Sequence, residues 1–285
     1  MEQFLIALGV PEKKVQELYF WAWELQRILR DSSFDITEQN PTFFHAGFPT
    51  VALPEGSRPI LELAEEGCIS DNFIAVVEYL LSRGEDLKDA TDYHWSPSTK
   101  NHMNRRLIVP FYYEDRIVGW TARAIDDSIK PKYFNNSPNG YLFNCNVMNT
   151  DRKYLILTEG IFDALSIDGV ALQTNDLNDK KISWINATKQ TKILVPDRDD
   201  AGARLIDIAL KEGWNVAMPF GTGSKDSQWW DHDIKDVADA VKRYGKLWTL
   251  RSIIASSTNN EAKVNLARKK IKASHRTYTF LNDGE

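Results

Sequence analysis

The sequence predicts an α/β fold in which an α+β N-terminal subdomain is followed by an α/β domain with a largely parallel sheet. Between residues 106 and 123, two alternating runs flank a short acidic turn, which is typical of an antiparallel hairpin. After Asp151, short apolar runs alternate with helical segments, which is typical of βαβ units. With 285 residues, 42% of them hydrophobic, the chain is long enough to form two domains.

The first third of the chain contains two predicted helices separated by an irregular segment. Apolar residues at helical spacing after Pro11 predict an amphipathic helix over Glu12–Arg30, most simply a packing element. Residues 32–59 are rich in Pro, Gly, Ser and Thr without sustained periodicity, so we expect a linker or an irregular wrap. Helical spacing returns over Asp71–Ser82.

The predicted hairpin comprises Arg106–Tyr113, a turn at Glu114 and Asp115, and Arg116–Arg123. Its side chains alternate between the two faces of the ribbon, as expected of paired strands. Basic residues lie at its ends.

The parallel sheet is predicted from four apolar runs after Asp151. They are Tyr154–Leu157, Val170–Gln173, Lys192–Val195 and Val216–Met218. The clearest helix between them is Ala201–Leu210, with Asp200 expected at its N-cap and Gly213 at its C-terminal stop.

Several classes of protein are excluded by composition. No apolar run approaches the roughly 20 residues that span a bilayer, and the N-terminus has no secretory pattern, so we expect a cytoplasmic protein that contacts no membrane. The two cysteines, Cys68 and Cys145, are far apart, which excludes a disulfide framework and a zinc site built on CxxC pairs. Both are expected to be buried thiols, and His45 is expected to be structural.

The net charge of −5 is unevenly distributed along the chain. Residues 242–276 contain ten Lys or Arg and one acid, Glu261, so the tail is strongly basic. It is either an ordinary solvated helix or a surface for phosphate or a protein partner. A second basic cluster comprises Lys100, Arg105, Arg106, Arg116, Arg123, Lys130 and Lys132.

Carboxylates follow three of the predicted strands, at the edge of the sheet where functional groups gather. Glu159 follows the first strand, and Asp197 and Asp199 follow the third. A further set follows Val216–Met218: Asp231, Asp233, Asp236 and Asp239. Crowded carboxylates repel unless a cation lies among them, and oxygen ligands suit Mg²⁺. A lone glutamate at a strand end is usually solvated or a cap, but the combination favours a metal site.

Three of these segments resemble a known family. EGIFDALS, VPDRDDAG and IKDVADAV resemble the three acidic motifs of the TOPRIM domain in bacterial-type (DnaG-like) primases, especially those of bacteriophages. Upstream, RRLIVPF, GWTARAI, PKYFNNSP and YLFN resemble the RNA-polymerase subdomain of the same family, YLLSRGEDL resembles the segment before it, and LPEGSRPI resembles the start of phage members. The resemblance covers roughly residues 50 to 250 in an ordered series of motifs.

The resemblance implies a set of site residues and two Mg²⁺ or Mn²⁺ ions. Metal ligation, with a catalytic role for the first three, is implied for Glu159, Asp197, Asp199 and Asp236, and Asp163 is implied to support them. Binding of nucleoside triphosphate and template is implied for Arg106, Arg123, Lys132 and Asn135, with Lys132 also catalytic. Paired metal ions can activate the 3′-hydroxyl and assist release of pyrophosphate, while Lys and Arg neutralise the triphosphate.

The chain departs from the family pattern in two places. Cellular members usually carry two acids, one residue apart, in the third motif, whereas Ala238 occupies the second place here and Asp239 is displaced by one. The second metal is therefore held differently, through Asp233 or Asp239 as candidates. The ligands of the family's N-terminal zinc ribbon are also missing, so no zinc is expected.

The sequence is thus interpreted as a DNA primase core that synthesises short RNA primers on single-stranded DNA from ribonucleoside triphosphates. Expected partners are the replicative helicase and a zinc ribbon on a separate domain or subunit. The alternatives are an accessory subunit of a phage replisome without independent activity and, less favoured, a TOPRIM nuclease. For Trp229 and Trp230, a role in a loop or in the core is preferred to stacking on a base. The expected divisions are 1–60 (helix and linker), 61–150 (polymerase subdomain), 151–245 (TOPRIM) and 246–285 (basic helical tail).

Overall fold

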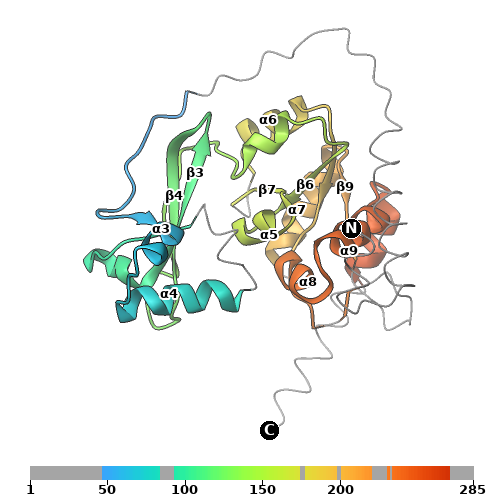
Figure 1. Cartoon of the computed structure of the whole chain (residues 1–285). Helices are drawn as coiled ribbons and strands as arrows, with labels where there is room; N and C mark the ends of the chain where they lie inside the picture. Colours follow the sequence, from blue (N-terminus) through green and yellow to red (C-terminus); the bar gives the residue numbers. More distant parts are fainter. Residues whose placement is uncertain are drawn as a thin grey trace, which may run out of the picture. The chain divides into compact units, whose positions relative to one another are not determined.

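The computed structural model describes residues 47–83, 93–173, 177–197, 200–219, 230–231 and 233–269. All helices and strands named below belong to one compact unit formed by residues 44–150 and 154–285. The helix predicted at Glu12–Arg30 lies outside the described residues. The predicted fold class is confirmed, because an antiparallel sheet is followed along the chain by a parallel one (Figure 1).

The antiparallel sheet has five strands in the order β1-β2-β3-β4-β5. Their bounds are β1 Arg58–Pro59, β2 His94–Trp95, β3 Arg106–Tyr113, β4 Arg116–Ala124 and β5 Tyr133–Asn136. The helices of this half are α3 Ile60–Glu65, α4 Asp71–Ser82 and the 3-10 helix η2 Lys100–Arg105. The bounds predicted for α4 are confirmed, and its N-terminus is capped by Ser70, whose hydroxyl accepts a hydrogen bond from the Phe73 N–H at 3.3 Å.

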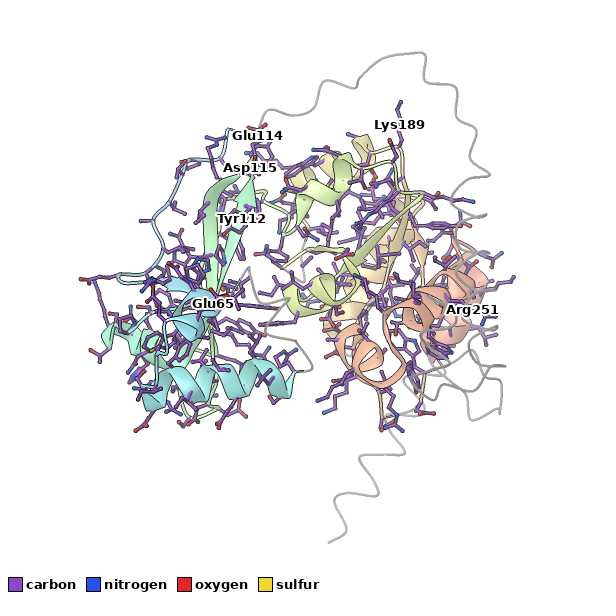
Figure 2. All side chains as sticks on the ribbon, in the orientation of Figure 1. Glu65, Tyr112, Glu114, Asp115, Lys189 and Arg251 are labelled. Carbon is purple, nitrogen blue, oxygen red and sulfur yellow. The ribbon has the colours of Figure 1, made fainter. Side chains whose placement is uncertain are left out.

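The predicted hairpin is β3 and β4, joined by a two-residue turn. Glu114 and Asp115 have φ of 48° and 61°, which is the left-handed pair that a type I′ turn requires. Figure 2 shows both residues at the tip of the ribbon. Because side chains alternate along β3, Leu107 and Val109 enter the main core whereas Ile108 packs with Trp120 on the other face.

The parallel sheet has four strands in the order β7-β6-β8-β9, and all three pairings are parallel. The strands are β6 Tyr154–Thr158, β7 Val170–Ala171, β8 Thr191–Leu194 and β9 Asn215–Val216. The helices are α5 Ile161–Ile167, α6 Asp179–Ala187, α7 Asp200–Lys211, α8 Val237–Tyr244 and α9 Lys246–Ser256, with the 3-10 helix η3 Cys145–Asn149 before β6. Every predicted strand is therefore present.

The predicted boundaries were wrong by one or two residues in places. The second strand of the domain was expected to reach Gln173, but Gln173 has φ of 57°, so the chain leaves the extended conformation there. The last strand was expected at Val216–Met218. The observed strand, β9, begins one residue earlier, at Asn215, and ends at Val216. Helix α7 includes Asp200, which was expected to be its cap, and Gly213 has the φ of 74° expected of a stop after the helix.

The parallel sheet is buried on both faces. Leu155 and Leu157 of β6 point into the core that also contains Leu107, whereas Ile156 points to a second cluster with Ile193. Trp230 belongs to this second cluster, is 1% exposed, and donates from Nε1 to the Ser252 hydroxyl at 2.7 Å. Of the two roles preferred for Trp230 from the sequence, loop or core, the structure confirms the core role. Trp229 lies outside the described residues.

The cysteines and the tail complete the fold. Cys145 is buried as expected, but the same expectation was wrong for Cys68, which is half-buried because it follows the turn at Gly67 that ends α3 near the surface. Of the basic tail, α9 and residues 261–269 are helical, and residues 270–285 lie outside the described part. None of the helices in the described ranges combines the length and hydrophobicity that crossing a membrane would require.

Candidate active site

Glu159 and Asp197 lie next to each other at the carboxyl edge of the parallel sheet. They follow β6 and β8, which are hydrogen-bonded neighbours. The Glu159 carboxylate accepts a hydrogen bond at Oε1 from the Asp197 N–H at 3.0 Å. A Cβ at Gly202, in the first turn of α7, would lie 2.9 Å from this same oxygen and 2.4 Å from the Asp197 carbonyl. The glycine therefore allows α7 to approach both acidic residues closely.

A second acidic group comprises Asp163, Asp236 and Asp239, on α5 and α8, which pack against each other. Asp163 is 7% exposed, and its Oδ1 accepts a hydrogen bond from the Ala238 N–H at 2.9 Å. Asp236 caps α8 by accepting the Asp239 N–H at 2.8 Å. The hydrogen bond between Ala238 and Asp163 thus links the third acidic motif, IKDVADAV, to the first, EGIFDALS.

The environment makes two of these carboxyl groups hard to ionise. Burial, followed by the nearby charge of Asp236, raises the pKa of Asp163 to about 7. Burial also raises the pKa of Asp236, although the hydrogen bond from Asp239 opposes it. A bound cation would relieve both effects.

Of the remaining acidic candidates, two lie at the surface and one lies outside the described residues. Asp231 and Asp233 are exposed and both pair with Arg243, at 3.4 and 3.8 Å. Asp199 lies outside the described residues. Within the described ranges, no three His, Cys, Asp or Glu side chains are arranged to hold a metal ion. The structure thus brings together Glu159 with Asp197, and Asp236 with Asp163, as two groups.

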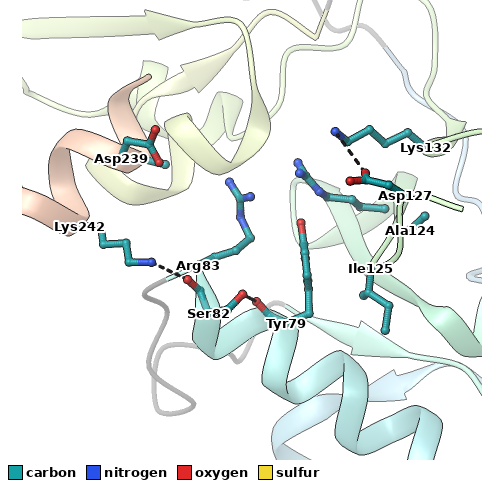
Figure 3. A pocket seen from close by; sticks show the side chains of 11 residues that line it. Tyr79, Ser82, Arg83, Ala124, Ile125, Asp127, Lys132, Asp239 and Lys242 are labelled. Atoms are coloured by element: carbon teal, nitrogen blue, oxygen red, sulfur yellow. Dashed lines mark hydrogen bonds and ion pairs between the residues drawn. The ribbon is translucent and has the colours of Figure 1, made fainter. Parts of the chain in front are cut away.

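A cavity of about 290 Å³ adjoins the second acidic group (Figure 3). It is lined by Tyr79, Ser82, Arg83, Arg123, Ala124, Ile125, Asp127, Lys132, Ala238, Asp239 and Lys242. The lining includes four cationic side chains and two carboxylates, so it favours an anion. Lys242 donates to the Ser82 carbonyl at 2.7 Å, and Lys132 lies 4.0 Å from Asp127.

The two arginines of the cavity lie against aromatic rings. The Arg83 guanidinium carbon lies 4.4 Å from the centroid of the Phe162 ring. The Arg123 guanidinium lies 5.2 Å from Phe162, 5.2 Å from Tyr133 and 5.7 Å from Tyr79, and it donates to the Tyr133 hydroxyl. Nε of Arg123 and the hydroxyl of Tyr79 are buried without a hydrogen-bond partner. Both residues line the cavity, although these two atoms are buried.

The other predicted nucleotide residues occupy different positions. Arg106 is 1% exposed and donates to the backbone carbonyls of Asn101 at 3.0 Å, Ala122 at 3.2 Å and Lys132 at 3.5 Å, so it is not part of the cavity lining. Burial lowers its pKa. Asn135 on β5 is exposed, and its Oδ1 accepts a hydrogen bond from the Thr121 hydroxyl. Among the described residues, its amide nitrogen donates no hydrogen bond.

Sequence reasoning missed Tyr79, Arg83 and Lys242 as lining residues. Tyr79 lies in the last turn of α4 and Arg83 directly follows the helix, and both belong to the segment YLLSRGEDL, which carried a resemblance but no individual assignment. Lys242 was counted only as part of the basic tail, whereas it lies on α8 one turn after Ala238 and Asp239. Helical spacing from the third acidic motif was the signal that would have found it.

The fold is similar to that of solved DnaG primase catalytic domains. One, bound to single-stranded DNA, is 14% identical over 70% of this chain and 79% of that chain, with a TM-score of 0.51. The RNA polymerase domain of Mycobacterium tuberculosis primase DnaG is 18% identical over 70% and 82%, with a TM-score of 0.51. The zinc-binding and RNA polymerase domains of the Aquifex aeolicus primase are 22% identical over 70% and 60%, with a TM-score of 0.51.

At these identities the likeness concerns the fold. No protein-family model matches the chain, and no curated protein matches its sequence.

Proposed function

We propose that this chain is the catalytic core of a DNA primase, which joins ribonucleotides into short primers on a single-stranded DNA template. One observation carries the proposal: on a fold similar to primase catalytic domains, an acidic group on α5 and α8 adjoins a cavity with four cationic side chains. Metal-dependent nucleotidyl transfer needs both a carboxylate site and a cationic site for the triphosphate.

The carboxylates are assigned to metal binding. Glu159, Asp197, Asp199 and Asp236 are proposed as ligands of two Mg²⁺ or Mn²⁺ ions, with Asp163 in support. Their chemistry fits, because all are oxygen donors and the raised pKa values of Asp163 and Asp236 mark a place where a cation is favourable. Asp239 is preferred to Asp233 as an additional ligand, since Asp239 lines the cavity whereas Asp233 is exposed beside Arg243.

The cationic residues are assigned to the triphosphate. Arg83, Arg123, Lys132 and Lys242 converge on the cavity and would neutralise charge on the phosphates as pyrophosphate leaves. Arg106 acts behind them, because its guanidinium binds the carbonyl of Lys132 at 3.5 Å and steadies that backbone. Asn135 is assigned to the template through its exposed amide.

The chain's own residues then contribute positioning and charge. Bound ions would lower the pKa of the 3′-hydroxyl and stabilise the negative charge on the phosphoryl and leaving-group oxygens. Glu159, which accepts a hydrogen bond from the Asp197 N–H, would orient the attacking hydroxyl, and Lys132, which lines the cavity, would balance charge on the leaving group. Selection of the template sequence would come from partners, namely a replicative helicase and a zinc ribbon on another domain or subunit.

The proposal is tested by primer synthesis. The chain is supplied with Mg²⁺, four ribonucleotides, single-stranded DNA and the helicase and zinc-ribbon proteins of its own replication system, and labelled products are resolved by length. Lys132→Ala and Arg123→Ala should each reduce synthesis about 10²-fold if each contributes a transition-state contact of about 3 kcal/mol. Calorimetry should find Mg²⁺ binding unchanged in both, since neither side chain is a ligand.

A complete lack of primers from the unmodified chain would remove the catalytic proposal. The same chain would then be an accessory subunit that retains the fold. The observation favouring this second candidate is Ala238, whose backbone binds Asp163 where the family pattern has an acid.

A further inference from the structure

Phe162 lies where the acidic helix α5 meets both arginines of the cavity. Its ring is 4% exposed, and the guanidinium carbons of Arg83 and Arg123 lie 4.4 and 5.2 Å from its centroid. It is also the residue immediately before Asp163, which binds the backbone of the third acidic motif. Phe162 therefore packs against both arginines of the cavity and is also the chain neighbour of the buried acid Asp163.

The two arginines depend on Phe162 to different degrees. Arg123 is additionally held by the rings of Tyr79 and Tyr133 and by its hydrogen bond to the Tyr133 hydroxyl. Arg83 follows the last residue of α4, and among the described residues Phe162 supplies the only ring against its guanidinium, whose charge also acts on Asp163 and Asp236. A buried ring attracts a guanidinium through its quadrupole and restricts where the cation can lie.

We propose that Phe162 is a positioning residue that holds Arg83, and to a lesser extent Arg123, in place for the phosphates of the incoming nucleotide. The inference rests on the proposed function of the cavity, which takes a polyphosphate. Without the ring, Arg83 would sample more rotamers and would have to be ordered by the ligand itself, so binding would weaken.

The inference is tested by a double-mutant cycle on binding rather than on synthesis. Calorimetry measures the affinity of inorganic tripolyphosphate, without divalent metal, for the full chain, Phe162→Leu, Arg83→Ala and the double variant. Phe162→Leu should weaken binding about 10-fold, and in the Arg83→Ala background the same change should have a much smaller effect, because the contact is already gone. The corresponding cycle with Arg123→Ala should show weaker coupling.

A matched control is Phe73→Leu. Phe73 is 3% exposed in the same core, but its ring packs against Trp95 at 5.4 Å, and among the described residues no arginine lies over it. It should lose stability like Phe162→Leu while binding tripolyphosphate normally. If Phe162→Leu does not fold, Phe162→Met conserves volume and takes its place in the cycle.

Equal weakening by Phe73→Leu and Phe162→Leu, or additive effects of Phe162→Leu and Arg83→Ala, would overturn the inference. The unmodified chain must bind tripolyphosphate, and failure to do so would also overturn it. Absence of primer synthesis with the binding cycle intact would remove the proposed activity and leave the positioning role of Phe162 standing.

Discussion

Individual carboxylates of the candidate site have different environments, and these environments predict different behaviour. Glu159 and Asp197 are partly buried, and the Glu159 carboxylate accepts a hydrogen bond of 3.0 Å from the Asp197 N–H. Asp163 is almost fully buried, and Asp233 is exposed beside Arg243. The same residue type thus divides into a ligand candidate, a supporting residue and a surface residue.

The ligand candidates are tested by Asp197→Ala. Mg²⁺ affinity measured by calorimetry should fall about 10-fold or more, while circular dichroism stays unchanged because the residue lies at a strand end and not in the core. Asp233→Ala is the matched control and should retain affinity, since its carboxylate pairs with Arg243 at the surface. Unchanged affinity in Asp197→Ala would contradict the assignment.

The buried carboxyl of Asp163 predicts a pH dependence of stability. Its pKa is raised to about 7 in the folded chain, whereas an unfolded aspartate titrates near 4, so the folded state binds more protons between these values. The free energy of unfolding should therefore fall as pH rises from about 4 to about 7. Asp163→Asn keeps the oxygen that accepts the Ala238 N–H, and should be more stable than the unmodified chain at pH 8 by about 1 to 4 kcal/mol.

Urea denaturation of both proteins at pH 5 and pH 8, in chelator, measures this difference. Mg²⁺ should reduce it in the unmodified chain, since a bound cation favours the ionised acid. Equal pH dependence in the two proteins would show that Asp163 ionises normally.

At the scale of elements, the site depends on how closely helices approach the ends of strands. Helix α7 is the next element after β8, and Gly202 in its first turn lies against the Asp197 carbonyl and the Glu159 carboxylate. Helix α8 is fixed to α5 by the bond between Ala238 and Asp163. These two contacts set the spacing of the acidic motifs.

Gly202→Ala tests the first contact. The added Cβ would lie 2.4 Å from a backbone oxygen, so α7 must shift, and we expect a loss of about 1 to 3 kcal/mol in stability together with weaker Mg²⁺ binding. Gly47→Ala is the control, because a Cβ there meets nothing within 4 Å. Thermal unfolding and calorimetry measure both variants. A Gly202→Ala protein with normal stability would show that α7 lies farther from the acids.

At the scale of the whole molecule, a net charge of −5 coexists with a locally cationic cavity and a basic tail. Phosphate contacts supply affinity without sequence information, whereas base contacts supply specificity. The only cysteines in the sequence, Cys68 and Cys145, are too far apart to form the CxxC pairs of a zinc ribbon, a kind of module that could read bases. The chain alone should therefore bind single-stranded DNA weakly and without strong sequence preference.

Fluorescence anisotropy with labelled oligonucleotides measures this expectation. If about four phosphates are contacted, affinity should fall about 50-fold between about 50 and about 200 mM salt, equally for unrelated sequences. A scrambled oligonucleotide of the same length is the control. Strong selection of one trinucleotide by the chain alone would place the recognition element inside it.

The sequence by itself determined the elements that depend on local pattern. The hairpin of β3 and β4, helix α4, and the alternation of strands and helices after Asp151 were predictable, because alternation, helical spacing and turn residues act over a few positions. The same patterns placed Glu159 and Asp197 at strand ends, and neighbouring parallel strands then bring them together.

Only the tertiary structure decided which distant side chains meet. Arg106 was predicted to bind nucleotide, yet its guanidinium is buried among backbone carbonyls, because burial depends on the partners of β3 and not on its own sequence. The cavity combines Arg83, which follows α4, with Lys242 on α8, and no periodic pattern connects these residues. Packing joins them through contacts such as that of Lys242 with the Ser82 carbonyl, 160 positions away, and interactions at that separation leave no signal in a local window of sequence.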